Sequence, residues 1–258
     1  MNWTYPLLMS AAVTTGLLVS RLTPRPAGLS ARQRLAIGLG AFCGGMLAAK
    51  LPFVLLDWEG FLSGAAWFDS GKTLVLGLVG GYFGVEATKW ALNIRVRTGD
   101  SFAAPVAAAV AVGRLACFSA GCCHGVATSL PWGVDFGDGV CRHPTQLYEA
   151  AFHLTCAAIL LQMQARGVCR GQLVKLYIIA YLTYRFLTEY VRPEPELWLG
   201  WTAYQWGSLV LIPVFALLWW RDARSLRREA PAALLAEVVA RRAALETAMA
   251  ARLEALPA

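Results

Sequence analysis

Seven apolar runs, each long enough to cross a lipid bilayer, dominate this chain of 258 residues. A helix that crosses a bilayer needs about 20 mostly apolar residues. Seven such helices occupy more than half of the chain and leave only short loops between them. We therefore predict an all-α, polytopic membrane protein with one transmembrane domain over residues 1–221. The seven expected segments lie near 5–20, 34–56, 73–93, 102–122, 146–164, 173–191 and 203–220.

The composition agrees with a protein whose solvent is lipid. Hydrophobic residues make up 57% of the chain and charged residues only 15%, whereas about 25% of a soluble protein is charged. The net charge of +7 is spread over short clusters between apolar runs and forms no single basic face. We therefore predict no nucleic-acid partner.

Arginines alternate between loops in a way that predicts the orientation. They follow the first, third, fifth and seventh segments, for example Arg21, Arg95, Arg166 and Arg221, while the other loops are mostly acidic. Because Lys and Arg are retained on the cytoplasmic side, we expect the N-terminus outside and the C-terminus inside. The first segment has no basic residue before it, so we expect a retained helix and no cleaved signal peptide. Residues 222–258 form an Ala- and Arg-rich cytoplasmic tail, expected to be partly helical.

Polar residues recur on one face of the sixth segment. Tyr177, Tyr181, Arg185, Glu189 and Arg192 are 4, 4, 4 and 3 residues apart, which places them on one helical face. A charge inside a membrane is costly, so Arg185 and Glu189 should face the interior of the bundle. Two simpler alternatives remain open: these two residues pair only with each other, and Arg192 extends to the nearby membrane surface.

The fourth segment contains another arginine, Arg114, without an acidic partner in its own helix. Such a cation needs an anion from elsewhere. Glu149, Glu189 or the phosphate of a ligand are the three candidates. Arg114 and Arg185 on two adjacent helices could together hold one phosphodiester, because the planar guanidinium group matches phosphate oxygens.

The fifth segment begins with a polar cluster. Pro144 suits the start of a helix, and Gln146, Tyr148 and Glu149 follow it within one turn. Packing alone does not explain three polar side chains at that position. His143 precedes them and is either a proton-transfer group near the membrane surface or an ordinary loop histidine.

Four of the seven cysteines lie toward the outer side, at positions 117, 122, 123 and 141. Three explanations compete for them: a disulfide from Cys141 to Cys122 or Cys123, a thiolate activated by Arg114, and a metal site that includes a histidine. Because the spacing matches no common metal-binding pattern, disulfides or plain thiols rank first, a nucleophile second and a metal third. We therefore expect no metal and no cofactor.

Taken in order, these motifs resemble the prolipoprotein diacylglyceryl transferase family. Its members are bacterial membrane enzymes that move diacylglycerol from phosphatidylglycerol to the lipobox cysteine of preprolipoproteins. The family has seven helices in the orientation deduced above, and the resemblance implies a multi-pass protein of the cytoplasmic membrane. The matching segments are GRLACFSAGCCHG at 113–125, RHPTQLYE at 142–149, AYLTYRFLTEYVRPEP at 180–195 and YQWGS at 204–208.

The resemblance also implies roles for individual residues. Arg114 and Arg185 would hold the phosphate of the lipid headgroup while the acceptor thiolate attacks the diacylglyceryl carbon, and both would offset charge on the departing phosphate. The implied catalytic residues are Arg114, Arg185, His143, Tyr181 and Glu189. The implied substrate-binding residues are Gly113, Gln146, Tyr148, Glu149 and Arg192.

Three positions depart from the family pattern. Cys117 stands where the family has asparagine, Cys122 where it has glutamate, and Val79 where a histidine usually precedes two glycines. Two alternatives therefore accompany the transferase hypothesis. One is a divergent paralogue that uses the same lipid-binding cavity and a thiol centre of Cys117, Cys122 and Cys123 on another acceptor. The other is a non-catalytic lipid-binding membrane protein.

Overall fold

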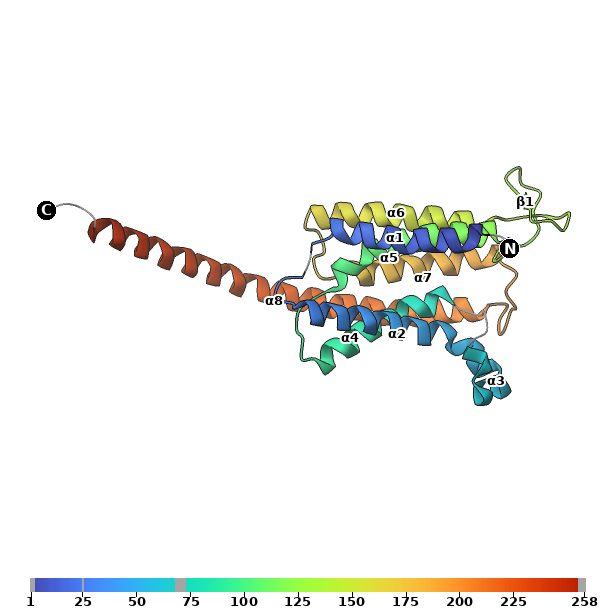
Figure 1. Ribbon diagram of the computed structural model, residues 1–258, viewed down its shortest axis with the longest axis horizontal. Coiled ribbons are helices and arrows are strands. Elements are labelled where there is room, and N and C mark those ends of the chain that lie inside the picture. Colours follow the sequence, from blue (N-terminus) through green and yellow to red (C-terminus); the bar gives the residue numbers. More distant parts are fainter. Residues whose placement is uncertain (1–2, 25, 68–72, 255–258) are drawn as a thin grey trace. The chain divides into compact units, whose positions relative to one another are not determined.

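Long α-helices form most of the structure, a computed structural model that describes residues 3–24, 26–67 and 73–254 (Figure 1). All seven expected segments are helical, and short helices lie at Trp58–Ser63, Ala65–Trp67 and Glu189–Val191. The seven-helix prediction thus holds for the positions of the helices. The α-helices are α1 (Thr4–Leu22), α2 (Ala31–Leu56), α3 (Trp58–Ser63), α4 (Leu74–Ala91), α5 (Gly99–Ser119), α6 (Thr145–Ala165), α7 (Leu173–Thr188) and α8 (Ala203–Glu254).

Four of the described helices are long and apolar enough to cross a membrane by length and composition alone. They are α1, α2, α5 and the Ala203–Leu226 part of α8. Of the helices at the other three expected segments, α7 has only 16 residues, and α4 and α6 contain polar residues such as Glu86 and Glu149. Large apolar side chains such as Leu7 and Leu17 on α1 are exposed, as expected for a helix that contacts lipid.

Helix α5 forms the centre of one helix group and packs against α1, α6 and α7. Its buried residues are Pro105 and several alanines, including Ala103, Ala104, Ala107 and Ala108. Small side chains allow helix backbones to approach closely, which is how helices associate in a membrane without a hydrophobic driving force. The alanines of α5 therefore bring the polar residues of three helices close together.

Glycines join α2 to α4. A Cβ atom at Gly84 would clash with the carbonyl oxygen of Gly40, and one at Gly44 would lie 2.5 Å from the carbonyl oxygen of Gly80. The two backbones therefore touch at these positions. Gly80 therefore has a role in helix packing. That role does not depend on Val79, the buried residue that precedes it.

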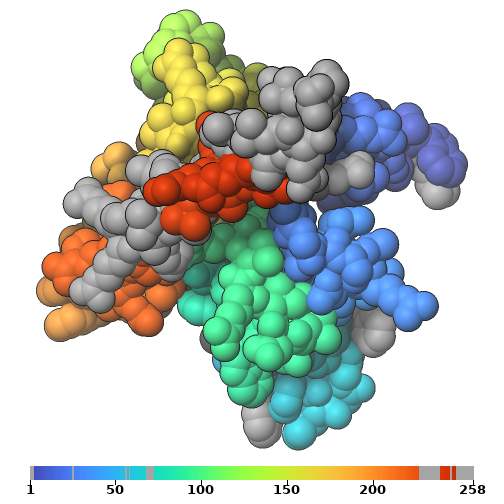
Figure 2. Space-filling model, turned by 90° about the vertical axis from the view of Figure 1, so that its left-hand side faces the viewer, coloured from blue at the N-terminus to red at the C-terminus, as the bar shows by residue number. Residues whose placement is uncertain are grey.

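The two ends of the long helices carry different connecting segments. The α1–α2, α4–α5 and α6–α7 connections lie at one end of the described helices up to residue 215 (Figure 1). Figure 2 looks onto this end, where the α4–α5 segment, drawn in green, reaches the surface. The opposite end carries α3 and a ribbon of two short antiparallel strands, β1 (Val134–Asp135) and β2 (Cys141–Arg142) (Figure 1). The all-α prediction did not include this ribbon.

The chain divides into two compact units, Met1–Phe215 and Ala216–Ala258. Helix α8 is continuous and extends to Glu254, so the tail expected to be partly helical is helical over nearly its whole length. Within the second unit, Arg242 and Glu246 form an exposed ion pair of 2.9 Å, one helical turn apart.

Candidate active site

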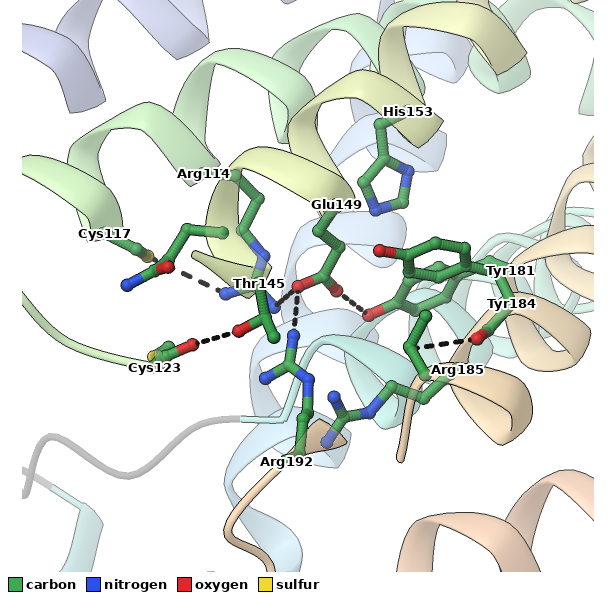
Figure 3. A network of polar contacts seen from close by, with 12 residues as sticks. Arg114, Cys117, Cys123, Thr145, Glu149, His153, Tyr181, Tyr184, Arg185 and Arg192 are labelled. Atoms are coloured by element: carbon green, nitrogen blue, oxygen red, sulfur yellow. Dashed lines mark hydrogen bonds and ion pairs between the residues drawn. The ribbon is translucent and has the colours of Figure 1, made fainter. Parts of the chain in front are cut away.

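Glu149 lies at the centre of a buried network of polar contacts (Figure 3). Its side chain is fully buried. The carboxylate accepts a hydrogen bond of 2.5 Å from the Tyr181 hydroxyl and one of 2.6 Å from Nη2 of Arg192, and it forms an ion pair with Nη2 of Arg114. The network therefore joins α5, α6, α7 and the segment that follows α7.

The network carries a surplus of positive charge. Two guanidinium groups share one carboxylate, and a buried charge is costly unless it is paired. Among the described residues, Nε of Arg114, Nε of Arg192 and Nη1 of Arg185 are buried donors without an acceptor. These nitrogens can bind a further anion with several oxygen atoms, such as a phosphate.

Arg185 forms a separate cluster next to this network. Its Nη2 lies 3.0 Å from Glu189 and 3.6 Å from Glu194, and its guanidinium group lies 4.2 Å from the centre of the Tyr204 ring. The hydroxyl of Thr202 donates a hydrogen bond of 2.9 Å to Glu189. The alternative in which Arg185 and Glu189 pair only with each other is therefore wrong, because the pair has further partners.

The structure selects among the anions considered for Arg114. Its partner is Glu149, across the α5–α6 contact, while Glu189 pairs with Arg185. The arginine that shares a carboxylate with Arg114 is Arg192. Arg192 is buried, so the alternative in which it extends to the membrane surface is wrong.

A second chain of contacts involves Tyr148. Its hydroxyl accepts a hydrogen bond of 2.8 Å from Nε1 of Trp132 and lies 3.3 Å from Nδ1 of His143. His143 is half-buried, and Trp132 is exposed. His143 is therefore held by a phenol at the edge of the site and does not touch the Glu149 network through any contact described.

The first residues of α6 fix the loop that follows α5. Nε2 of Gln146 donates a hydrogen bond of 2.6 Å to the carbonyl of Cys122, and the hydroxyl of Thr145 donates one of 2.8 Å to the carbonyl of Cys123. Both side chains are fully buried. Gln146 thus acts on the backbone of the cysteine loop.

Three thiols meet beside Arg114. The sulfur atoms of Cys117, Cys122 and Cys123 all lie within 4.8 Å of one another, and Nη1 of Arg114 lies 3.8 Å from the sulfur of Cys117. A hydrogen bond from the Cys117 thiol and the nearby Arg114 guanidinium lower the pKa of Cys123 to about 5. All seven cysteines are free, so the structure contains neither disulfide considered for Cys141.

Gly113, which the resemblance assigns to substrate binding, lies apart from the network. It faces α1, where an added Cβ would lie 3.9 Å from Cβ of Ala12, a place in helix packing. His153 is buried beside the network: its ring centre lies 4.8 Å from that of Tyr181, and its Nδ1 lies 2.8 Å from the Tyr177 hydroxyl.

Four residues of the site were not singled out from the sequence. Each has a hydroxyl, an indole or an aromatic ring. Thr145, Thr202 and Tyr204 lie within or beside a matched motif, which was the available signal, whereas Trp132 lies in the loop between two matched motifs. They are Trp132, Thr145, Thr202 and Tyr204.

Fold and site together define a helical membrane protein with buried arginines around a carboxylate. The family model for prolipoprotein diacylglyceryl transferase matches residues 2–221. The chain belongs to the prolipoprotein diacylglyceryl transferase family. Two relatives are named phosphatidylglycerol–prolipoprotein diacylglyceryl transferase. The protein from Clostridioides difficile is 29% identical over 74% of this chain and 78% of its own length. The protein from Solidesulfovibrio magneticus is 31% identical over 74% of each chain.

Proposed function

We propose that this chain transfers the diacylglyceryl group of phosphatidylglycerol to a cysteine thiol of a preprolipoprotein. The relatives carry this activity in their names. The observation in this chain that supports it best is the set of buried arginine donors without acceptors beside Glu149. A lipid phosphate supplies the oxygen atoms that those donors need.

The proposed reaction breaks the bond between the diacylglyceryl carbon and a phosphate oxygen while a new bond forms to the acceptor sulfur. Negative charge then develops on the departing glycerol phosphate. Three arginines would offset that charge. Arg114 and Arg185 are the pair predicted to clamp the lipid phosphate, and Arg192 shares Glu149 with Arg114. Fixed donors in a site shielded from water stabilise a developing charge most strongly.

We also propose the arrangement of the chain in the membrane. The seven long helices cross the cytoplasmic membrane of a bacterium, with the N-terminus outside and the tail inside. The arginine-bearing loops at one end of the helices support this orientation. The polar network supports it too, since Arg114 and Arg185 lie near the ends of α5 and α7 and Glu149 near the start of α6, away from those loops. Labelling of single cysteines placed in these loops, in intact cells with a membrane-impermeant maleimide, tests it. Labelling of the arginine-bearing loops would show that they lie outside and would refute the proposed orientation.

The alternatives that accompanied the transferase hypothesis are not favoured. The two relatives described above are named for transfer from phosphatidylglycerol to prolipoprotein. The cysteine replacements leave Arg114, Glu149 and Tyr181 in contact with one another. The cysteines therefore alter the part of the site beside Arg114 and leave the Arg114–Glu149–Tyr181 contacts in place.

Complementation provides the direct test of the proposed function. A strain depleted of its own transferase would express this chain, and mass spectrometry would measure the diacylglyceryl group on a reporter lipoprotein. We expect the wild type and the tail variant Arg242→Ala to modify the reporter, and Arg114→Ala and Arg185→Ala to insert normally without modifying it. An unmodified reporter beside well-expressed wild-type protein would refute the function. Near-normal transfer by either arginine variant would refute the clamp.

A further inference from the structure

The distances between the three thiols of the cysteine cluster, Cys117, Cys122 and Cys123, suit a metal ion. A zinc ion binds thiolate sulfur at about 2.3 Å, which places tetrahedrally arranged sulfurs about 3.8 Å apart. The sulfurs of Cys122 and Cys123 are 3.7 Å apart, and all three sulfurs lie within 4.8 Å of one another. Binding of one ion therefore needs only a small adjustment. A disulfide would use two of the sulfurs and leave the third unexplained.

The backbone of the cluster is held in place by several contacts. Cys123 has a φ of 62°, a left-handed conformation that costs energy for a residue other than glycine. Its carbonyl accepts the hydrogen bond from buried Thr145, and the carbonyl of Cys122 accepts the one from buried Gln146. The amide of Cys122 also bonds to the carbonyl of Cys117 at 3.2 Å. This local structure fixes where the sulfurs converge.

The cluster supplies three ligands and has an accessible side. Structural zinc sites use four protein ligands, whereas catalytic sites use three and keep one position open. Among the described residues the group consists of these three thiols, and Cys122 and Cys123 are exposed. Nearby Arg114 and Arg192 would balance the negative charge of several thiolates. The arrangement is that of a zinc site open to an incoming ligand.

We infer that Cys117, Cys122 and Cys123 bind one zinc ion, and that its open position takes the thiol of the acceptor cysteine. This inference rests on the proposed transferase function. It also gives each of the three converging thiols a role, because all three supply ligands.

The zinc ion would activate the acceptor. A thiol that coordinates zinc loses its proton, here to water. The bound thiolate sulfur then forms a bond to the diacylglyceryl carbon, and the bond from that carbon to the phosphate oxygen breaks. Glycerol phosphate leaves and takes up a proton from water, and no group is oxidised or reduced. Arg114, which contacts both Cys117 and Glu149, places the nucleophile beside the leaving phosphate.

Metal content of the purified full-length protein in detergent micelles tests the site itself. We expect about one zinc per chain in the wild type and in Cys141→Ser, a matched control on the exposed ribbon. Cys117→Ser, Cys122→Ser and Cys123→Ser should each weaken zinc binding by more than the roughly 10–100-fold typical of a lost outer-shell partner. Equal metal content in the wild type and the cluster variants would overturn the inference, and so would a disulfide between two cluster cysteines found by mass spectrometry.

Cobalt in place of zinc tests the open position without any turnover. Its thiolate charge-transfer and d–d absorption bands should shift when a peptide with the lipobox cysteine is added, and should not shift with the matched serine peptide. Identical spectra with both peptides would overturn the role in acceptor binding. A shift without any transfer activity would support the zinc site and refute the transferase function instead. Full transfer by chelator-treated protein, unchanged by added zinc, would refute the zinc inference and leave the transferase function standing.

Discussion

Replacement of Glu149 by glutamine removes the only carboxylate shared by Arg114 and Arg192 among the described contacts. The substitution keeps the size of the side chain and one oxygen that can accept a hydrogen bond from Tyr181. It leaves two guanidinium groups beside a neutral amide. Removal of one partner from a buried ion pair costs about 3–5 kcal/mol, so we expect the free energy of unfolding to fall by about that amount.

Glu246→Gln is the matched control for this experiment. Glu246 also lies on a long helix and pairs with Arg242 at 2.9 Å, but both side chains are exposed. An exposed ion pair contributes about 1 kcal/mol or less. Unfolding of both variants by SDS in mixed micelles compares the two losses directly.

Anionic lipid adds a second measurement to the same variant. With Glu149 neutralised, a phosphate can take the place of the missing carboxylate, so phosphatidylglycerol should stabilise Glu149→Gln more than it stabilises the wild type. Phosphatidylcholine, whose headgroup has no net charge, should show a smaller difference. A loss of stability no larger than that of Glu246→Gln would refute the reasoning about buried charge. Equal stabilisation of variant and wild type would refute phosphate binding at these arginines.

Three further outcomes follow from the contacts described. Tyr181→Phe removes a buried hydrogen bond to a charged group and should lower the free energy of unfolding by about 1.5–3 kcal/mol, measured in the same SDS titration. Arg192→Lys loses the planar guanidinium group, so transfer to the reporter should fall while zinc content stays unchanged; normal transfer would contradict a phosphate role. Gly84→Ala introduces a clash with α2 and should cost at least about 1–3 kcal/mol, whereas Gly38→Ala, with open space around it, should be neutral or stabilising.

The sequence predicted the helices well because apolar length is a strong signal. Every expected segment forms a helix, and the bounds agree closely except at the end of α8, which continues beyond residue 220 to Glu254. The same signal did not predict the ribbon near Cys141, since two strands of two residues have no detectable period. It also did not predict α3, which is only six residues long.

The residues of the site were predicted better than their pairing. The periodicity of α7 assumed a helix that continues to Arg192, but α7 ends at Thr188, and a short 3-10 helix over Glu189–Val191 follows. Arg192 has an extended backbone, which directs it to Glu149. Which carboxylate meets Arg114 depends on the rotation of α6 against α5, and no pattern within a single helix specifies that rotation.

The first turn of α6 touches several parts of the molecule at once. Thr145 and Gln146 bind the backbone of the cysteine loop, Tyr148 meets His143, and Glu149 binds the arginines. A displacement of this single turn would move all these contacts together. The nucleophile side and the leaving-group side of the site are therefore mechanically coupled, and any opening that admits a lipid through this turn would also shift the thiols.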